Sequence, residues 1–320
     1  MKAGRLGLAL VVAALIALTA SVSSAAAACT VRNNVEAIID DSGSMGGTDS
    51  NNLRSAGLKL IMNTPGNENK TLGAIEFGDD ADSVFAPGPI GTNRTAFSQA
   101  LDQKIQADNG GTNYNAAFDL AKTHDPNANA RLFLTDGGHN DGDYLNGHQG
   151  GPPTYTIGLG FIFGSDETRL KTIAAETGGI YRKAQDDSDL QAAMNDVNAA
   201  INCQSAPVRV SDTFKKKGSK THKLTIKKGV RSVQFALSWV SANDKFSIGR
   251  FRLKQGKKLV GVAKARHLKV KKRRGKTFVS LRLSGLSRGK LSYRVTANKV
   301  PSNTFTGVKL VTQASRSKRK

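Results

Sequence analysis

Residues 29–203 alternate short, continuous apolar runs with segments in which apolar residues recur at helical spacing. The runs predict strands at 35–39 and 72–77, a short edge piece at 83–85, buried strands at 131–135 and 155–159, and an extended segment at 179–182. The periodic segments predict helices at 53–62, 97–105, 114–121, 170–175 and 190–201. Strands that alternate with helices predict an α/β domain, with a doubly wound, mostly parallel sheet and helices on both faces.

The pattern changes after residue 203. Short stretches of alternating apolar and polar residues predict strands at 208–210, 222–226, 233–239, 246–253, 278–283 and 291–295. Glycines separate most of them, as expected for turns between antiparallel strands. We predict an all-β sandwich over 204–312, in which Val233, Phe235, Leu237 and Trp239 face the core. Residues 313–320 are predicted to be a basic, disordered tail.

The N-terminus has the pattern of an export signal. Lys2 and Arg5 precede an apolar run over 6–18, and small residues fill 23–28 before a cleavage site. The run is shorter than the roughly 20 residues that a spanning helix needs. We therefore expect a signal peptide over 1–28, a secreted or cell-envelope location, and no transmembrane span in the mature chain.

Charge divides the chain at the same place. The sequence has 47 basic and 25 acidic residues and a net charge of +22. Only two of the acids, Asp212 and Asp244, follow residue 203, whereas 33 of the basic residues do, so the two parts carry −9 and +31. This asymmetry indicates two modules with different partners.

Two arrangements of basic residues are candidates for binding a polyanion. Four basic residues alternate with apolar ones and predict one cationic sheet face: Arg250, Arg252, Lys254 and Arg282. The second arrangement is the cluster Lys271, Lys272, Arg273 and Arg274. So many like charges repel one another unless an anion compensates. Export favours an anionic cell-wall polymer, lipid headgroups or polysaccharide over nucleic acid. The alternatives are a solubilising surface and docking onto the acidic first domain.

Two cysteines, Cys29 and Cys203, bracket the acidic part of the chain. Export makes a disulfide between them permissible. The alternative is that Cys29 carries lipid, as in bacterial lipoproteins that are cleaved directly before a cysteine. The large aliphatic residue that is usual three positions earlier is replaced by Ala26, and this favours the disulfide.

Hydroxyl and carboxylate side chains collect where predicted strands end. Asp40, Ser42 and Ser44 form a D-x-S-x-S pattern directly after the first strand. Thr112 follows two glycines before a predicted helix, and Asp136 follows the strand over 131–135. The carboxyl ends of parallel strands lie along one edge of a sheet, where ligands bind. Oxygen ligands of this kind suit Mg²⁺, and also Mn²⁺ or Ca²⁺.

These three segments resemble the metal-ion-dependent adhesion site of the von Willebrand factor type A family, which has D-x-S-x-S, a separate threonine and a Thr-Asp-Gly. The resemblance covers nearly all of 29–203. It implies that Asp40, Ser42, Ser44, Thr112 and Asp136 hold a divalent cation with an open coordination position. It also implies a protein partner that presents an Asp or Glu carboxylate to the metal.

The predicted function is metal-dependent adhesion or protein binding outside the cell, with the basic domain as a second attachment to an anionic polymer. Catalysis is not predicted, since the five histidines are scattered and no serine has a base assigned by spacing. His139, three residues after Asp136, is close enough to border the metal site, but it is expected to be a solvated loop residue. The alternatives are a secreted hydrolase, an accessory protein that uses the type A domain for recruitment, and a purely electrostatic coat protein.

Overall fold

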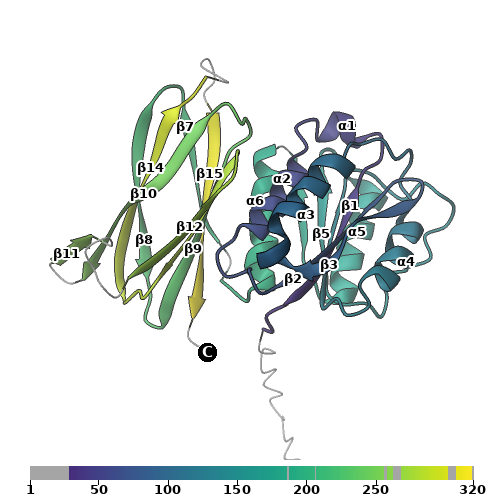
Figure 1. Cartoon of the computed structure of the whole chain (residues 1–320), viewed down its shortest axis with the longest axis horizontal. Coiled ribbons are helices and arrows are strands. Elements are labelled where there is room, and N and C mark those ends of the chain that lie inside the picture. The colour runs from purple at the N-terminus through teal and green to yellow at the C-terminus, as the bar shows by residue number, and fades with distance from the viewer. Residues whose placement is uncertain are drawn as a thin grey trace, which may run out of the picture.

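The computed structural model describes residues 29–185, 187–205, 207–255, 258–261, 268–301 and 308–318. Their elements form an α/β domain and, beside it, a domain of β-strands (Figure 1). Within these residues, no helix is both long and apolar enough to cross a membrane. The predicted signal peptide, residues 1–28, lies outside the described part of the chain.

A six-stranded sheet forms the centre of the first domain, in the order β3-β2-β1-β4-β5-β6. Its strands are β1 (Asn34–Asp40), β2 (Thr71–Phe77), β3 (Ala81–Pro89), β4 (Ala130–Thr135), β5 (Thr154–Leu159) and β6 (Tyr181–Ala184). All neighbours are parallel except β2 and β3. The predicted mostly parallel sheet is confirmed. The edge strand β3 is longer than predicted, because residues as far as Pro89 pair with β2.

Helices cover both faces of this sheet. They are α1 (Met45–Thr48), α2 (Leu53–Met62), α3 (Ile90–Lys104), α4 (Tyr114–His124), α5 (Gly164–Thr177) and α6 (Asp187–Ile201). Helices α2, α3 and α6 share a core with Ile39 and Leu134, whereas α4 and α5 share another with Ile38 and Phe133. Successive strand residues point to opposite faces, so the unbroken apolar runs of β1 and β4 are buried on both sides.

Two antiparallel sheets enclose the core of the second domain. Their strand orders are β11-β10-β14-β8 and β12-β13-β9-β15-β7. The strands are β7 (Val208–Phe214), β8 (Gly218–Ile226), β9 (Val230–Ser238), β10 (Lys245–Gln255), β11 (Lys258–Gly261), β12 (Lys269–Arg274), β13 (Phe278–Ser284), β14 (Gly289–Lys299) and β15 (Val308–Lys318). Val233, Phe235, Leu237 and Trp239 are buried in this core, as predicted.

The side-chain pattern misses three of these strands, β11, β12 and β15. Strand β11 pairs with β10. The basic cluster is part of β12, an edge strand paired with β13. Residues 313–318, predicted as a disordered tail, belong to β15, which pairs with both β9 and β7. Strands β12 and β15 form by backbone pairing with neighbouring strands, and neither the basic side chains of β12 nor the mixed polar and small side chains of β15 signal this pairing. Residues 319–320 lie outside the described part of the chain.

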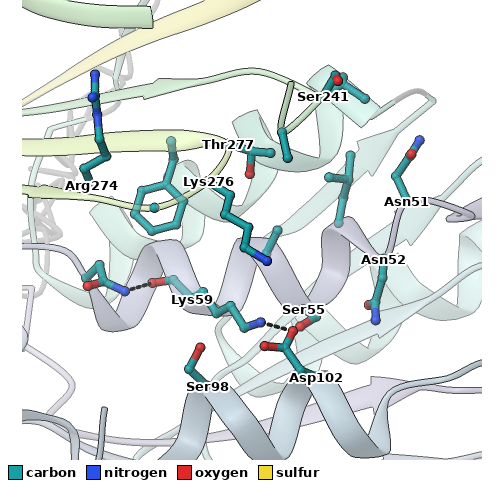
Figure 2. A pocket seen from close by; sticks show the side chains of 17 residues that line it. Asn51, Asn52, Ser55, Lys59, Ser98, Asp102, Ser241, Arg274, Lys276 and Thr277 are labelled. Carbon is teal, nitrogen blue, oxygen red and sulfur yellow. Dashed lines mark hydrogen bonds and ion pairs between the residues drawn. The ribbon is translucent and has the colours of Figure 1, made fainter. Parts of the chain in front are cut away.

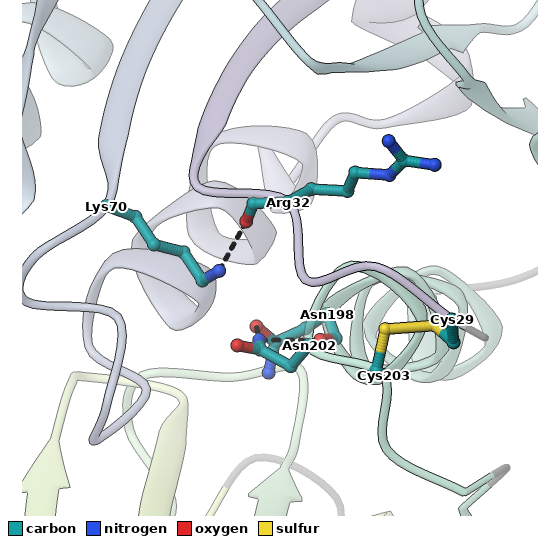
Figure 3. The surroundings of a disulfide bond; sticks show 6 residues. All are labelled: Cys29, Arg32, Lys70, Asn198, Asn202 and Cys203. Atoms are coloured by element: carbon teal, nitrogen blue, oxygen red, sulfur yellow. Dashed lines mark hydrogen bonds between the residues drawn. A yellow bond between two sulfur atoms is a disulfide. The ribbon is translucent and has the colours of Figure 1, made fainter. Parts of the chain in front are cut away.

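A disulfide joins Cys29 to Cys203, as predicted, with the two Cα atoms 5.7 Å apart (Figure 3). The Arg32 N–H donates to the carbonyl of Ile201 in α6 at 2.8 Å. The Lys70 ammonium in turn donates to the Arg32 carbonyl. These contacts tie the segment before β1 to the end of α6, and the disulfide leaves Cys29 without a thiol for lipid.

The outer face of the five-stranded sheet packs against α6 and α2 of the first domain. Ser232, Gln234, Ala236 and Ser238 alternate with the core residues of β9 and are buried. Charge also joins the domains: Arg273 pairs with Glu68 at 3.5 Å, and Arg209 pairs with Asp196. The acidic domain therefore docks onto the basic one through the five-stranded sheet, whereas Arg250, Arg252 and Lys254 of the predicted cationic face lie in the four-stranded sheet.

A cavity of about 520 Å³ lies at the junction of the two domains (Figure 2). Helices α2 and α3 line one side of it, where Lys59 and Asp102 form an ion pair. Arg274 and Lys276 line it from the second domain. None of the five predicted metal ligands, all of them in the described residues, lines this cavity, so the candidate metal site is a separate place.

Candidate metal centre

Asp40 is the last residue of β1, and two neighbours hold its buried carboxylate. Thr135, the last residue of β4, donates from Oγ1 to Oδ2 at 2.5 Å. Ser42 donates to Oδ1 from its N–H at 2.9 Å and from its Oγ at 2.5 Å. Because β1 and β4 are adjacent parallel strands, their carboxyl ends bring Asp40 and Asp136 to the same edge of the sheet.

A chain of oxygen atoms runs from Asp40 to Asp136. Ser42 Oγ lies 3.1 Å from Ser44 Oγ, and Ser44 Oγ donates to Asp136 Oδ1 at 2.7 Å. The other carboxylate oxygen, Asp136 Oδ2, is buried and has no hydrogen-bond partner among the described residues. A buried acceptor without a partner costs free energy, and it commonly marks a place for an ion or a water.

Thr112 comes from a third segment, in which a glycine allows close approach to the D-x-S-x-S loop. Gly110 has a φ of +53°, and its carbonyl accepts the Gly43 N–H at 3.0 Å. A Cβ on Gly110 would lie 1.9 Å from Asp79 Oδ2, so a larger residue would displace this carboxylate and would also strain the backbone at its positive φ. Thr112 Oγ1 lies 3.7 Å from the place of a Cβ on Gly137. All five predicted ligands therefore gather at one edge of the sheet.

This donor set suits a hard divalent cation. Among the residues described, no group of three His, Cys, Asp or Glu side chains is arranged to hold a metal. The carboxylates of Asp40 and Asp136 would therefore need the three hydroxyl groups as further ligands. Burial raises the pKa of Asp40 to about 6 against the hydrogen bonds from Ser42 and Thr135, and repulsion from Asp136 adds to the rise. A cation between the carboxylates would remove that repulsion and give Asp136 Oδ2 a partner. The residues therefore fit Mg²⁺.

A buried ion-pair network behind the site is not predicted by the sequence pattern. Asp41 is fully buried, and its carboxylate accepts from Arg54 Nη2 at 2.6 Å. It also accepts two backbone N–H groups after α3, at 2.9 and 2.8 Å. Arg54 Nη1 pairs with Asp49 at 3.2 Å. The network ties α2 and the end of α3 to the D-x-S-x-S loop, and its only sequence signal is the second aspartate of Asp40-Asp41.

His139 is not the solvated loop residue that the sequence predicts. Its Nδ1 accepts the Tyr114 N–H at 3.1 Å, at the first residue of α4. Its ring lies 5.7 Å from the rings of both Tyr114 and Tyr144. Because Nδ1 already accepts a hydrogen bond, His139 holds the start of α4 in place, next to the loop that carries Thr112.

A second polar array is not predicted from the sequence, because its residues are far apart in the chain. His124 Nε2 lies 2.8 Å from Ser83 Oγ, and His124 Nδ1 lies 2.7 Å from Glu36 Oε1. A Ser–His–acid triad has the same connectivity. Here burial raises the pKa of Glu36 to about 9 and lowers the pKa of His124, so both are neutral at pH 7. The array lacks the carboxylate charge that a triad uses, and we assign it a structural role.

The raised pKa of Glu36 links folding to pH. The folded chain holds a proton on this carboxyl that the unfolded chain releases above about pH 4.5. Stability is therefore lost as the pH rises from 4.5 toward 9, at up to about 1.4 kcal/mol per pH unit for one group.

The family model of the von Willebrand factor type A domain matches residues 34–196. The chain belongs to this family, as its motifs predict. The matched residues span the six-stranded sheet, helices α1 to α5, the first part of α6 and all five predicted ligands. A comparison with curated proteins returns no match.

Solved structures are similar to the chain at low sequence identity. A von Willebrand factor type A protein from Catenulispora acidiphila is 15% identical, with a TM-score of 0.44 over 84% of this chain and 59% of its own. Proximal thread matrix protein 1 of the mussel byssus, with a zinc-occupied metal-ion-dependent adhesion site, is 16% identical, with a TM-score of 0.44 over 59% and 51%. The von Willebrand factor domain of Mfa5, a type V pilus tip protein from Porphyromonas gingivalis, is 13% identical, with a TM-score of 0.42 over 54% and 96%. This chain spans less than two thirds of the length of the first two.

Proposed function

We propose that the chain is an extracellular adhesion or protein-binding protein whose α/β domain binds its partner through a divalent cation. Asp40, Ser42, Ser44, Thr112 and Asp136 would hold the cation, and hard oxygen donors favour Mg²⁺. When bound, the cation supplies an open coordination position for an Asp or Glu carboxylate of the partner. The observation that carries this proposal is the buried Oδ2 of Asp136, which has no partner among the described residues and lies near the buried carboxylate of Asp40.

The ligand charges explain why such a cation would still attract a carboxylate. Only Asp40 and Asp136 are acidic, and the other three ligands are neutral hydroxyls. Asp41 is the next residue, but its charge is paired with Arg54. The two carboxylates therefore balance the charge of one divalent cation. A carboxylate of the partner could then bind the cation without a large excess of negative charge at the site.

We further propose that residues 1–28 direct export and that the mature chain acts outside the cell or at its envelope. The disulfide between Cys29 and Cys203 supports this location, because disulfides form and persist in oxidising compartments. A binding role is favoured over the hydrolase alternative, since burial raises the pKa of Glu36 to about 9 and so favours an uncharged carboxyl in the Ser83–His124–Glu36 array.

Capture with and without a chelator tests the metal-dependent attachment. The immobilised mature chain is incubated with cell-envelope extract in Mg²⁺, washed, and eluted with EDTA. We expect EDTA to release proteins from the wild type that are missing from the eluate of Asp136→Ala, because the variant lacks a charged ligand. Proteins that stay bound in EDTA, or that bind the variant equally well, would contradict metal-dependent binding.

The second domain supports a further attachment to an anionic polymer. Five basic residues of β8, β10 and β14 share the outer face of the four-stranded sheet: Lys223, Arg252, Lys254, Lys290 and Arg294. The register places Lys254 opposite Lys290, so like charges are adjacent there. The only two acids of this domain, Asp212 and Asp244, are 3% and 0% exposed and do not offset the charge of the face.

The basic cluster on β12 is partly engaged within the molecule. Arg273 pairs with Glu68, and Arg274 Nη2 donates to the Phe246 carbonyl at 2.6 Å. Lys271 and Lys272 remain exposed. Arg282, predicted on the cationic face, lies instead in the other sheet, because β13 pairs with β9. We therefore place the main polyanion surface on β8, β10 and β14.

Salt dependence distinguishes the two basic surfaces, with a short DNA duplex as a polyanion of defined charge. The affinity of the mature chain should fall log-linearly with salt, and each lost phosphate contact should shallow the slope by about 0.9. Replacing Arg252, Lys254, Lys290 and Arg294 together by Ser should therefore shallow the slope by up to about 4. The matched fourfold Ser variant of residues 271–274 should change it less. An unchanged slope in the first variant would contradict this assignment.

A further inference from the structure

Two phenylalanines are exposed at the edge of the sheet that carries the candidate metal centre. Phe161 is 88% exposed and Phe163 is 73% exposed, on the segment that joins β5 to α5. They are among the three most exposed large apolar side chains of the described residues, together with Leu145. Burying a phenylalanine is worth about 1.5–3 kcal/mol, so two exposed ones point to a surface that a partner covers.

The segment 160–166 contacts both loops that carry the candidate ligands. A Cβ on Gly160 would lie 2.8 Å from Cγ2 of Thr48, the last residue of α1, which follows Ser44 directly. A Cβ on Gly138, two residues after Asp136, would lie 2.1 Å from Asp166 Oδ1. The phenylalanine segment therefore borders the metal centre, between the D-x-S-x-S loop and the loop after β4.

The fold holds this segment in one conformation. Ile162, between the two phenylalanines, is 3% exposed and packs in the core under α4 and α5. Its carbonyl accepts a hydrogen bond from Lys183, which also pairs with Glu167 at 3.0 Å. Because Ile162 is anchored on both its side chain and its backbone, its two neighbours are presented to solvent as a preformed apolar surface.

We infer that Phe161 and Phe163 form the apolar half of the ligand site, and that the partner is a protein segment with an Asp or Glu carboxylate next to apolar side chains. This inference rests on the proposed metal-dependent function. The cation would take the carboxylate, and the phenylalanines would cover the neighbouring apolar groups. The cation alone would bind any exposed Asp or Glu carboxylate, so the apolar contact supplies the selectivity for the partner.

A displayed random peptide library tests the inference. Peptides are selected on the mature chain in Mg²⁺ and eluted with EDTA. The wild type should enrich an acidic residue flanked by Phe, Trp, Leu or Ile. The Phe161→Ser/Phe163→Ser variant should bind Mg²⁺ as the wild type does, yet bind the enriched peptides at least about tenfold more weakly, through the lost apolar contact. The matched variant Val208→Ser/Val270→Ser, which changes exposed apolar residues of the second domain, should bind them normally.

The other outcomes overturn the inference in separable ways. Acidic peptides without apolar neighbours, or equal peptide affinity in the Phe161→Ser/Phe163→Ser variant, would remove the apolar contact and leave the metal-dependent function standing. A selection that yields no EDTA-eluted acidic peptide would overturn both. Binding to phosphatidylcholine–phosphatidylglycerol vesicles without Mg²⁺, lost in the same variant, would make the phenylalanines a membrane contact instead.

Discussion

Asp136→Ala should abolish Mg²⁺ binding and leave the fold intact. Asp136 contributes one of the two negative charges at the site, and its Oδ2 has no protein partner among the described residues. The loss should exceed the roughly 10–100-fold that follows removal of a residue that only orients a metal ligand. In EDTA the variant should unfold like the wild type, because the carboxylate accepts a single described hydrogen bond, from Ser44. Isothermal titration with Mg²⁺ measures the affinity, and thermal unfolding in EDTA measures the stability.

Asp40→Ala should also abolish binding, but with a cost in stability. The Asp40 carboxylate accepts hydrogen bonds from the Ser42 N–H and from the hydroxyls of Ser42 and Thr135. The hydroxyls have other acceptors nearby, but the buried Ser42 N–H would lose its acceptor, at about 1–3 kcal/mol for a buried group. Asp119→Ala is the matched control, since that carboxylate is 69% exposed and pairs only with Lys122 in the described structure. Unchanged Mg²⁺ affinity in both Asp40→Ala and Asp136→Ala would refute the site.

Replacing Cys29 and Cys203 together by Ser should lower the free energy of unfolding of the first domain by about 5 kcal/mol, in the chain-entropy account of disulfide stabilisation. The bond closes a loop with a sequence separation of 174. Without it, the unfolded chain gains the freedom that the bond removes. Intact-mass analysis before and after reduction and alkylation verifies the bond. Two free thiols, or a lipid mass on Cys29, would refute it.

The two domains can be monitored separately in this experiment. The helices of the described residues all lie in the first domain, so far-ultraviolet circular dichroism follows its unfolding. Trp239, the one tryptophan of the sequence, is buried in the second domain, and its fluorescence follows that domain. The helical transition should move to lower denaturant in the Cys29→Ser/Cys203→Ser variant. A reductant should move the wild-type transition and leave that of the variant unchanged.

The sequence by itself predicts the α/β domain and the five residues of the candidate metal centre. The core strands of this domain are buried on both faces, so their apolar runs stand out from the amphipathic helices between them. The ligands follow or end such strands, or lie in a loop marked by glycines. In this domain the sequence pattern and the tertiary structure agree, because the carboxyl ends of parallel strands lie at one edge of the sheet. Residues that directly follow such strands therefore lie close together.

Only the tertiary structure decides how distant segments pair. The basic residues of β12 and the polar residues of β15 become strands because neighbouring strands offer backbone partners, which their side chains do not encode. Arg282 faces the first domain, and Arg54 reaches Asp41, through contacts between segments that are separate in the sequence. Phe161 and Phe163 are apolar in sequence and would be expected in a core. They are exposed because Ile162 occupies the core position between them, and one extended segment cannot bury three successive side chains in the same core.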